Sequence, residues 1–463
     1  MQSNDTFFKT YDIRGVFPSE INAAVFQRIG FAFGTYLRQL KKKKRLTMSV
    51  GRDLRASSEE LANAFMKGVI AAGVCVIDIG EVTTPLSYFA PHALRIDGGA
   101  MITASHNPAE YNGLKLTVAN LKHEPVQIGM GSGLEKVKEL YNRNGVMVGV
   151  EEKDNEWGEI TQKNIIGDYV KFLLRGVSLS RPLHIAVDAS GGAALRILPE
   201  LFNAAGIDYK PMFFEPDPMF RLHGPNPEDD DAREFIAREM KRDRYDAGVL
   251  FDGDGDRIFF FDETGSVAHP DVVSALIAEE ILKKHPKSNI VIEVAASRML
   301  QDAIEAAGGI ARRSKVGTVI VKQTMRRFKA LFGGETSGHY YFKDFWYHDS
   351  AMMAMLKILS IIAASSKPFS ELVASHPKPI QWRKRYSVRE DAGVVLKRLE
   401  NHFAMLGGTV DALDGVSVMF PEWWFNIRSS NTEPIIKLMI EAKSEAMLEE
   451  KLKEIEAIIH EMP

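Results

Sequence analysis

The chain contains the stretch His184-Ile185-Ala186-Val187, an apolar strand, followed by a helical segment from Ala194 to Ala204 that stops at Ala204-Ala205-Gly206. The same order of strand, helix and small-residue stop occurs twice more, around the stops Ala71-Ala72-Gly73 and Ala306-Ala307-Gly308. Glycine is favoured just past a helix end because it adopts the left-handed backbone conformation there. Alternating strands and helices predict parallel sheets that are covered by helices on both faces.

The C-terminal part of the chain has a different pattern. After Pro377-Lys378-Pro379 the sequence predicts strands near 380–388, 416–420 and 435–440 and helices over 392–406 and 445–460. Fewer and mixed elements are typical of a small α+β domain. We therefore expect three similar α/β domains with mixed, largely parallel sheets and a smaller C-terminal α+β domain. The predicted domain ranges are 1–158, 159–265, 266–376 and 377–463.

Composition indicates a large globular protein that does not bind polyanions in general. The 463 residues are 45% hydrophobic and carry a net charge of −3 at pH 7, which supports several cores and argues against nucleic acid as a partner. The basic run from Lys41 to Arg45 follows an amphipathic stretch, and a helix C-terminus favours cations, so a solvated helix end is expected there. The single cysteine, Cys75, the absence of a signal-peptide pattern at the start and the absence of a long apolar span predict a cytoplasmic protein without a membrane partner.

The densest group of charges is Asp252-Gly253-Asp254-Gly255-Asp256-Arg257, directly after the apolar run Ala247 to Phe251. Three carboxylates this close repel one another, so at neutral pH they need a cation or raised pKa values. Oxygen ligands favour a hard ion, and Mg²⁺ in particular where a phosphate shares the site. A calcium EF-hand loop is excluded because Arg257 occupies its glycine position. An ordinary Asp-Gly turn is the alternative to a metal site.

Three other polar loops carry candidate functional groups, and the first two of them follow strand-like runs. The first, Thr103 to Pro108, offers Ser105 as a nucleophile without the glycine-flanked elbow of an α/β hydrolase. The second, Gly334 to His339, combines a carboxylate, hydroxyls and an imidazole that suit a hydroxyl-rich ligand such as a sugar. The third, Arg428 to Pro434, offers a guanidinium, small polar side chains and backbone amides for a phosphate. Taken singly, each of these loops is also compatible with a plain turn.

Together these loops resemble one family, the α-D-phosphohexomutases, and within it the bacterial phosphomannomutase/phosphoglucomutase branch. The resemblance begins at Lys9-Thr10-Tyr11-Asp12-Ile13-Arg14-Gly15, passes through the four loops in the family's order and spans nearly the whole chain. It implies that the domains surround a central cleft. It also implies a reversible phosphoryl transfer between hexose 1-phosphate and hexose 6-phosphate, with mannose or glucose as the sugar, through a phosphoserine and a hexose 1,6-bisphosphate.

The same resemblance implies roles for individual residues. Ser105 is expected to carry the phosphoryl group, and Mg²⁺ is expected to bind that phosphate together with Asp252, Asp254 and Asp256. Other residues are expected to surround the phosphoryl group or lie near the proton transfer: Arg14, Lys115, Arg257 and His339, with His106 and Asn107 in support. The substrate is expected to contact a third set: Tyr11, Glu335, Ser337, Arg428, Ser430, Asn431 and Thr432. Sugar phosphates are the expected partners, hexose 1,6-bisphosphate the expected activator, and a monomer or weak homo-oligomer the expected assembly.

Two positions depart from the pattern of that branch. Ala295 stands where a lysine is common, and Thr318 stands where a histidine is common. Both changes remove polar contacts near the sugar, and Lys315 or Arg298 are the candidates to replace them. The sugar loop, with Thr336 at its centre, is also close to that of phosphoglucosamine mutases. A phosphoglucosamine mutase is therefore the alternative, followed by a non-catalytic sugar-phosphate-binding homologue and by a phosphatase.

Overall fold

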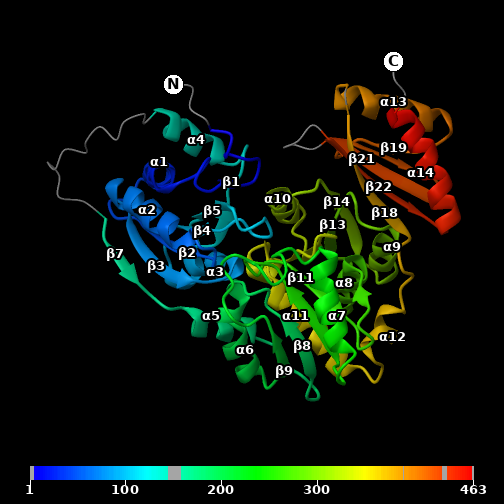
Figure 1. Cartoon of the computed structure of the whole chain (residues 1–463), viewed down its shortest axis with the longest axis horizontal. Helices are drawn as coiled ribbons and strands as arrows, with labels where there is room; N and C mark the ends of the chain where they lie inside the picture. The colour runs from blue at the N-terminus through cyan, green and yellow to red at the C-terminus, as the bar shows by residue number, and fades with distance from the viewer. Residues whose placement is uncertain (1–4, 144–157, 389, 430–434, 461–463) are drawn as a thin grey trace. The chain divides into compact units, whose positions relative to one another are not determined.

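The computed structural model describes residues 5–143, 158–388, 390–429 and 435–460. The chain divides into two compact units, the first formed by residues 1–268 with 337–372 and the second by residues 269–336 with 373–463. Figure 1 shows the chain coloured from its N-terminus to its C-terminus. Among the described residues, no helix combines the length and apolar character that crossing a bilayer requires.

The first unit begins with a seven-stranded mixed sheet. The strands run in the order β1-β5-β4-β2-β3-β7, with β6 paired to β5, and the pairs among β4, β2, β3 and β7 are parallel. The strand bounds are β1 Ile13–Val16, β2 Thr47–Arg52, β3 Cys75–Glu81, β4 Gly98–Ile102, β5 Tyr111–Ala119, β6 Pro125–Gln127 and β7 Ile160–Gln162. The helices of this region are α1 Ala23–Lys41, α2 Ser58–Ala71, α3 Thr84–Leu94 and α4 Leu134–Arg143.

Helices α1 and α2 pack closely over this sheet, side by side in Figure 1. Two glycines make the close approach possible. A Cβ atom on Gly30 would lie 2.1 Å from the carbonyl oxygen of Phe65, and one on Gly68 would lie 1.9 Å from that of Gln27. Any larger residue at either position would push the two backbones apart.

The first unit contains a second sheet, with the order β12-β11-β10-β8-β9. Its centre is parallel, because β8 pairs in parallel with both β10 and β9, while β11 and β12 add antiparallel strands at one edge. The bounds are β8 His184–Asp188, β9 Asp208–Met212, β10 Ala247–Phe251, β11 Ile258–Phe261 and β12 Val267–Ala268. The helices of this region are α5 Ile166–Leu173, η1 Ala193–Arg196, α6 Leu198–Ala205 and α7 Asp230–Met240.

The continuous helix predicted from Ala194 to Ala204 is wrong. The chain forms the short 3₁₀ helix η1 and then restarts as α6, which has Pro199 in its first turn. Proline lacks the backbone N–H that would bond one turn back, so it is tolerated at a helix start and not in the interior. The first unit is completed by an antiparallel pair, β16 Tyr340–Phe342 and β17 His348–Asp349, by η2 Lys343–Phe345 and by α11 Ala351–Ala364, which packs against β11. Helix α12, Phe369–Val373, follows at the boundary between the two units.

The second unit has a parallel set of strands in which β13 lies between β14 and β15. It also has an antiparallel sheet in the order β18-β22-β21-β20-β19, and helices α13 and α14 share a core with one face of that sheet (Figure 1). The strand bounds are β13 Asn289–Glu293, β14 Ile310–Ser314, β15 Phe332–Gly334, β18 Gln381–Ser387, β19 Thr409–Asp411, β20 Val416–Met419, β21 Trp423–Ser429 and β22 Ile435–Ala442. The helices are α8 Pro270–Lys284, α9 Arg298–Ala306, α10 Thr318–Phe328, α13 Ala392–Met405 and α14 Glu445–His460.

A buried carboxylate in the first turn of α8 makes the stability of the second unit depend on pH. Asp271 is 1% exposed and its Oδ2 accepts a 2.8 Å hydrogen bond from the backbone N–H of Ser297. Burial raises the pKa of Asp271 to about 7. Between pH 4 and 7 the folded chain therefore keeps a proton that the unfolded chain loses, so stability falls as the pH rises through this window.

We expect Asp271→Asn to be more stable than the unmodified chain at pH 8 and to lose most of this advantage at pH 5. The asparagine side chain still accepts from Ser297 but has no charge to desolvate. A shift of this size corresponds to at most about 4 kcal/mol between the two limits. Thermal melts of both proteins at the two pH values measure the difference, and an advantage that does not change with pH would contradict the assignment.

Candidate active site

Ser105 lies in the loop after β4 and is 3% exposed. Its backbone has a φ of +54°, in the left-handed region, and its N–H donates to the Thr103 hydroxyl at 2.8 Å. The Ser105 hydroxyl donates to Asp252 Oδ2 at 3.0 Å, and its oxygen is 3.3 Å from His106 Nδ1. The candidate nucleophile and the acidic loop, 147 residues apart in the chain, therefore meet directly.

Arg55 holds the Ser105 loop in place through its backbone carbonyl groups. Its guanidinium donates to the carbonyl oxygens of Ser105 and Asn107 at 2.8 and 2.6 Å and to that of Pro108 at 2.7 Å. Asp53 lies 3.2 Å from its Nε and compensates its buried charge. Sequence reasoning missed this arginine, although Asp53 to Arg55 directly follows the strand β2.

The acidic loop follows β10, and its three carboxylates are buried, with exposures of at most 1%. Asp252 Oδ1 accepts the backbone N–H groups of Asp256 and Arg257 at 3.1 and 3.2 Å, which curls the loop around that side chain. Gly253 is required for close approach, because a Cβ atom there would lie 2.9 Å from the carbonyl oxygen of Ser105. Each of the three aspartates offers an oxygen within 4.8 Å of the others.

Lys115, on β5, joins two of these aspartates. Its Nζ lies 2.7 Å from Asp254 Oδ2 and 2.6 Å from Asp256 Oδ2, and Thr84 donates to the same Asp254 oxygen at 2.6 Å. The other oxygen of each carboxylate, Oδ1, is buried without a hydrogen-bond partner in the described part of the chain. Lysine thus engages one oxygen of each aspartate and leaves the second for another ligand. These oxygen donors suit a hard cation, so the acidic triad can hold a metal ion.

The charges of this site shift one another's pKa values. Burial and the neighbouring carboxylates raise the pKa of Asp252 well above its usual range. Burial opposes ionisation of Asp254 as well, but Lys115 and Thr84 more than offset it and lower the pKa of Asp254. Burial disfavours the charged form of Lys115, yet Asp254 and Asp256 raise its pKa well above the ordinary value. Lys115 therefore remains charged. A further cation at the site would stabilise the ionised form of Asp252.

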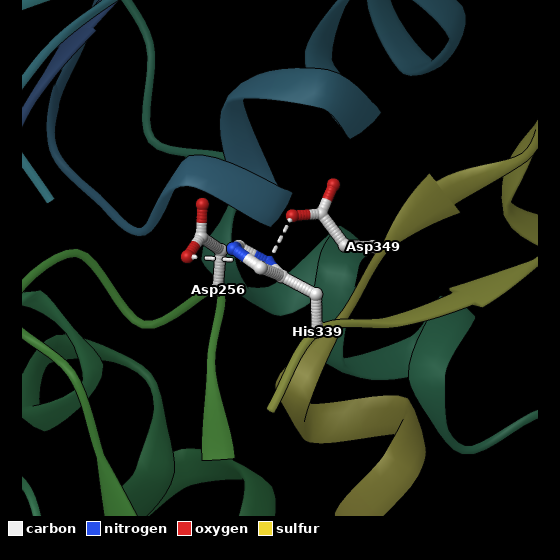
Figure 2. Close-up of side chains that lie close together, drawn as sticks. All are labelled: Asp256, His339 and Asp349. Carbon is white, nitrogen blue, oxygen red and sulfur yellow. Dashed lines mark ion pairs between the residues drawn. The ribbon is translucent and has the colours of Figure 1, made fainter. Parts of the chain in front are cut away.

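A second group, formed by Asp256, His339 and Asp349, shares Asp256 with the triad (Figure 2). His339 Nδ1 is 2.9 Å from Asp349 Oδ2 and 3.7 Å from Asp256 Oδ1, while its Nε2 accepts from Arg257 Nε at 3.0 Å. Because Nε2 accepts, the ring proton lies on Nδ1, toward the two carboxylates. The β16–β17 pairing brings Asp349 alongside this ring. Sequence reasoning missed Asp349, which carries no motif around it.

Arg14 approaches the site from β1. Its guanidinium donates to Asn107 in the Ser105 loop at 2.5 Å and to Asp12 at 2.6 Å. Burial, followed by the charges of Arg257 and Arg14, lowers the pKa of His106 well below its usual value, so this histidine is neutral. Tyr11 lies half-buried just before β1.

The remaining predicted residues are distributed over both units. Ser337 belongs to the first unit, whereas Glu335 and Arg428 belong to the second. Glu335 is 4% exposed, and Arg428 lies near the end of β21 opposite Lys437 of β22. Ser430, Asn431 and Thr432 lie outside the described residues. The structure thus brings Ser105, the three aspartates, Lys115, Arg257, His339 and Arg14 together in the first unit.

The two departing positions are part of the second unit. Ala295 packs with Trp424 and Met439 in a small apolar cluster, and Thr318 is the first residue of α10. Arg298 donates to the carbonyl oxygens of Phe420 and Pro421 at 3.1 and 3.0 Å. Its guanidinium is thus engaged in joining the start of α9 to the C-terminal sheet.

Comparison with known protein families gives one consistent result. Four family models match successive parts of the chain, and all four describe phosphoglucomutase/phosphomannomutase. They are the alpha/beta/alpha domains I, II and III, over residues 5–126, 167–265 and 269–380, and the C-terminal domain, over residues 388–458.

Individual relatives match along nearly their whole length. A phosphomannomutase of Escherichia coli is 34% identical over 464 residues, which covers 98% of this chain and 99% of that protein. A phosphoglucomutase/phosphomannomutase of Thermococcus kodakarensis is 34% identical with 96% of each chain covered. The crystal structure of a phosphoglucomutase/phosphomannomutase family protein of Burkholderia thailandensis superposes with a TM-score of 0.89 at 32% identity, over 99% of this chain and 97% of that one.

Proposed function

Because the chain belongs to the phosphoglucomutase/phosphomannomutase family, we propose that it is a hexose-phosphate mutase in which Ser105 carries the phosphoryl group that is transferred. The observation that carries this proposal is the hydrogen bond from the Ser105 hydroxyl to Asp252, one of three buried carboxylates that can hold a metal ion. The three carboxylates offer oxygen ligands for a metal ion, and a phosphate on Ser105 would add a further oxygen ligand.

The phosphoserine form transfers its phosphoryl group to the free hydroxyl of a hexose 1- or 6-phosphate. The Ser105 Oγ–P bond breaks, a bond from P to the sugar oxygen forms, the sugar hydroxyl loses its proton, and Ser105 regains one. The resulting hexose 1,6-bisphosphate turns over and returns its other phosphate to Ser105. The same compound serves as activator, because it can phosphorylate Ser105 in enzyme that has lost the group.

Residues of the first unit have different roles in this transfer. Asp252, Asp254 and Asp256 would hold Mg²⁺, which supplies positive charge to the phosphoryl oxygens as transfer proceeds. Lys115 lowers the pKa of Asp254 and holds Asp254 and Asp256 in place through ion pairs. His339, oriented by Asp349, accepts from Arg257 and so fixes the direction of that guanidinium, which we assign to the phosphoryl group. Arg14 orders the Ser105 loop through Asn107.

Substrate recognition is assigned to the loop Gly334 to His339 and to the segment Arg428 to Pro434. We propose that Glu335 and Ser337 bind sugar hydroxyls, that Arg428, Ser430, Asn431 and Thr432 bind the phosphate that is not transferred, and that Tyr11 lines the substrate site. Ala295 and Thr318 place no charge near the sugar. Mannose and glucose phosphates are the proposed substrates, glucosamine phosphate is the second candidate, and the proposed setting is a cytoplasmic monomer or weak homo-oligomer.

A substrate panel tests this function. Phosphorylated enzyme with Mg²⁺ and the matching 1,6-bisphosphate is given mannose, glucose or glucosamine 1-phosphate, and formation of each 6-phosphate is followed. We expect turnover with the first two sugars. A clear preference for glucosamine would identify the second candidate, and binding without turnover of any of the three would identify a non-catalytic homologue. Steady release of inorganic phosphate would identify a phosphatase.

Substitutions within the acidic loop separate metal binding from phosphoryl transfer. Asp254→Ala removes one of three carboxylates and is expected to raise the Mg²⁺ dissociation constant about 100-fold. Arg257→Ala keeps the backbone N–H that donates to Asp252, so we expect Mg²⁺ affinity to stay within about threefold while kcat falls about 10²- to 10³-fold. Titration calorimetry and kinetics at saturating Mg²⁺ measure the two effects. Equal losses of Mg²⁺ affinity in both variants would contradict this division.

A further inference from the structure

A buried pair of titratable side chains lies outside the site described above. Asp188 ends β8 and is fully buried, and the His223 side chain is 1% exposed. His223 Nε2 is 3.2 Å from Asp188 Oδ1, and its Nδ1 is 2.8 Å from the carbonyl oxygen of Gly224. The rings of Phe213 and Phe235 pack against the imidazole.

The pair must hold a proton. A backbone carbonyl and a carboxylate are both acceptors, so hydrogen bonds at both ring nitrogens need one proton more than a neutral imidazole and an ionised carboxylate carry. That proton lies either on the ring, as an imidazolium, or on Asp188. Burial disfavours the charged form of His223, but Asp188 outweighs it and raises the pKa of the ring. Burial likewise raises the pKa of Asp188. The charge of Asp217 also raises the pKa of the ring. A buried pair with this geometry is expensive to break.

Each partner of the pair anchors a segment that contacts the acidic loop. Asp188 Oδ1 accepts the backbone N–H of Ser190 at 2.8 Å, and the Ser190 hydroxyl donates to the carbonyl oxygen of Phe251, the last residue of β10, at 2.6 Å. Further along this segment, the N–H of Ala193 donates to the carbonyl oxygen of Gly253 at 2.9 Å. The first anchored segment thus fixes both the end of the strand and the first glycine of the loop.

The second segment contacts the same glycine from its other side. His223 is bonded to Gly224, and the next carbonyl oxygen, that of Pro225, accepts the N–H of Gly253 at 3.2 Å. Little space remains around this residue: a Cβ atom on Gly253 would lie 3.0 Å from the Pro225 side chain, and one on Gly192 would lie 2.5 Å from the Gly253 carbonyl oxygen. Gly253 is therefore clamped between the two segments that the Asp188–His223 pair joins.

We propose that the Asp188–His223 pair is a positioning element of the metal-binding loop, which sets cation affinity through Gly253 without contacting the cation or the sugar phosphate. This inference rests on the proposed assignment of Asp252, Asp254 and Asp256 as metal ligands. Gly253 lies between the first two of these ligands, so a shift of its backbone moves their carboxylates relative to each other. Groups that orient metal ligands from outside affect metal affinity by about 10- to 100-fold.

Four variants test the proposal by Mg²⁺ titration calorimetry on the full chain. Asp188→Asn removes the carboxylate charge of the pair, and His223→Phe removes both ring nitrogens while keeping a ring between Phe213 and Phe235. Each is expected to raise the Mg²⁺ dissociation constant about tenfold or more. His223→Gln keeps a donor near the Nε2 position and is expected to fall between the unmodified chain and His223→Phe. The double variant is expected to be no weaker than either single variant, because one interaction is lost in all three.

A matched control is available on the same strand. His184, at the other end of β8, forms a 2.8 Å pair with Asp208, whose side chain is 78% exposed. Asp208→Asn is expected to leave Mg²⁺ affinity unchanged. Mutase activity of the Asp188→Asn and His223→Phe variants should return to that of the unmodified enzyme at saturating Mg²⁺. Circular dichroism at the assay temperature without Mg²⁺ distinguishes this recovery from Mg²⁺-driven refolding of a destabilised chain.

Two outcomes would overturn the proposal: Mg²⁺ affinity of folded His223→Phe equal to that of the unmodified chain, or an equal loss in Asp208→Asn. If Asp188→Asn does not fold, as judged by circular dichroism, the two His223 variants carry the test. The calorimetric result is independent of the mutase assignment. If the unmodified chain transfers no phosphate but the variants still bind Mg²⁺ more weakly, the positioning role is supported. Only the proposed function is then rejected.

Discussion

Ser105→Ala is expected to abolish interconversion of hexose 1- and 6-phosphates, with a loss of kcat on the order of 10⁴-fold or more, because no other group replaces a covalent carrier. The substitution removes one buried oxygen and one hydrogen bond to Asp252, so the fold and the metal site should persist. Mg²⁺ affinity is expected to stay within about tenfold of the unmodified chain. A coupled assay of 6-phosphate formation, with Mg²⁺ and 1,6-bisphosphate present, measures the loss.

Ser360→Ala is the matched control. Ser360 lies on α11, and its hydroxyl donates to the carbonyl oxygen of Leu356 one turn earlier. The variant removes a serine hydroxyl from the same unit but touches no predicted site residue, so full activity is expected. Near-full activity in Ser105→Ala would reject the phosphoserine mechanism.

Lys115→Met is expected to have the second largest effect, on both stability and activity. The substitution keeps the length of the side chain but removes the cation that joins Asp254 and Asp256. Removing one partner of a buried ion pair costs about 3–5 kcal/mol, because the remaining charges stay desolvated. Activity is expected to fall at least about 10³-fold, since the carboxylates lose their fixed positions.

Added Mg²⁺ should restore much of the stability that Lys115→Met loses, because the cation replaces part of the missing charge. Thermal melts with and without Mg²⁺ measure this recovery, with Lys136→Met as the control. Lys136 is paired with Glu139, but its side chain is 63% exposed, so its loss should change stability by less than about 1 kcal/mol. If the melting temperature of Lys115→Met equals that of the unmodified chain and does not change with Mg²⁺, Lys115 does not hold the aspartates.

Local sequence patterns predicted the α/β architecture because short-range signals determine it. The three Ala-Ala-Gly stops do end helices, with Gly73, Gly206 and Gly308 at φ values of 76°, 65° and 78°. The strand β21 was not predicted, because Trp423, Trp424 and Phe425 are all buried and the alternation that marks a half-buried strand is absent. Arg428 accordingly lies in this strand and not in the loop after it. The domain boundaries remain predictions.

Local sequence patterns predicted the site only where several functional residues are neighbours in the sequence. The acidic loop and the Ser105 loop are such segments, and their meeting follows from the rule that α/β ligand sites gather at strand ends. The supporting contacts join residues that are far apart in the chain: Arg55 to the Ser105 loop, Asp349 to His339, and Lys115 to two aspartates. Such pairs depend on tertiary packing, and no local pattern marks them.

The most direct test of the account is to follow the phosphoryl group itself. Enzyme incubated with hexose 1,6-bisphosphate carrying ³²P, then digested and mapped by mass spectrometry, is expected to carry one phosphate, on Ser105. Addition of unlabelled hexose 1-phosphate should transfer the label to bisphosphate and then to hexose 6-phosphate. Label on another residue, or its release as inorganic phosphate at the rate at which the sugar phosphate is consumed, would contradict the mechanism.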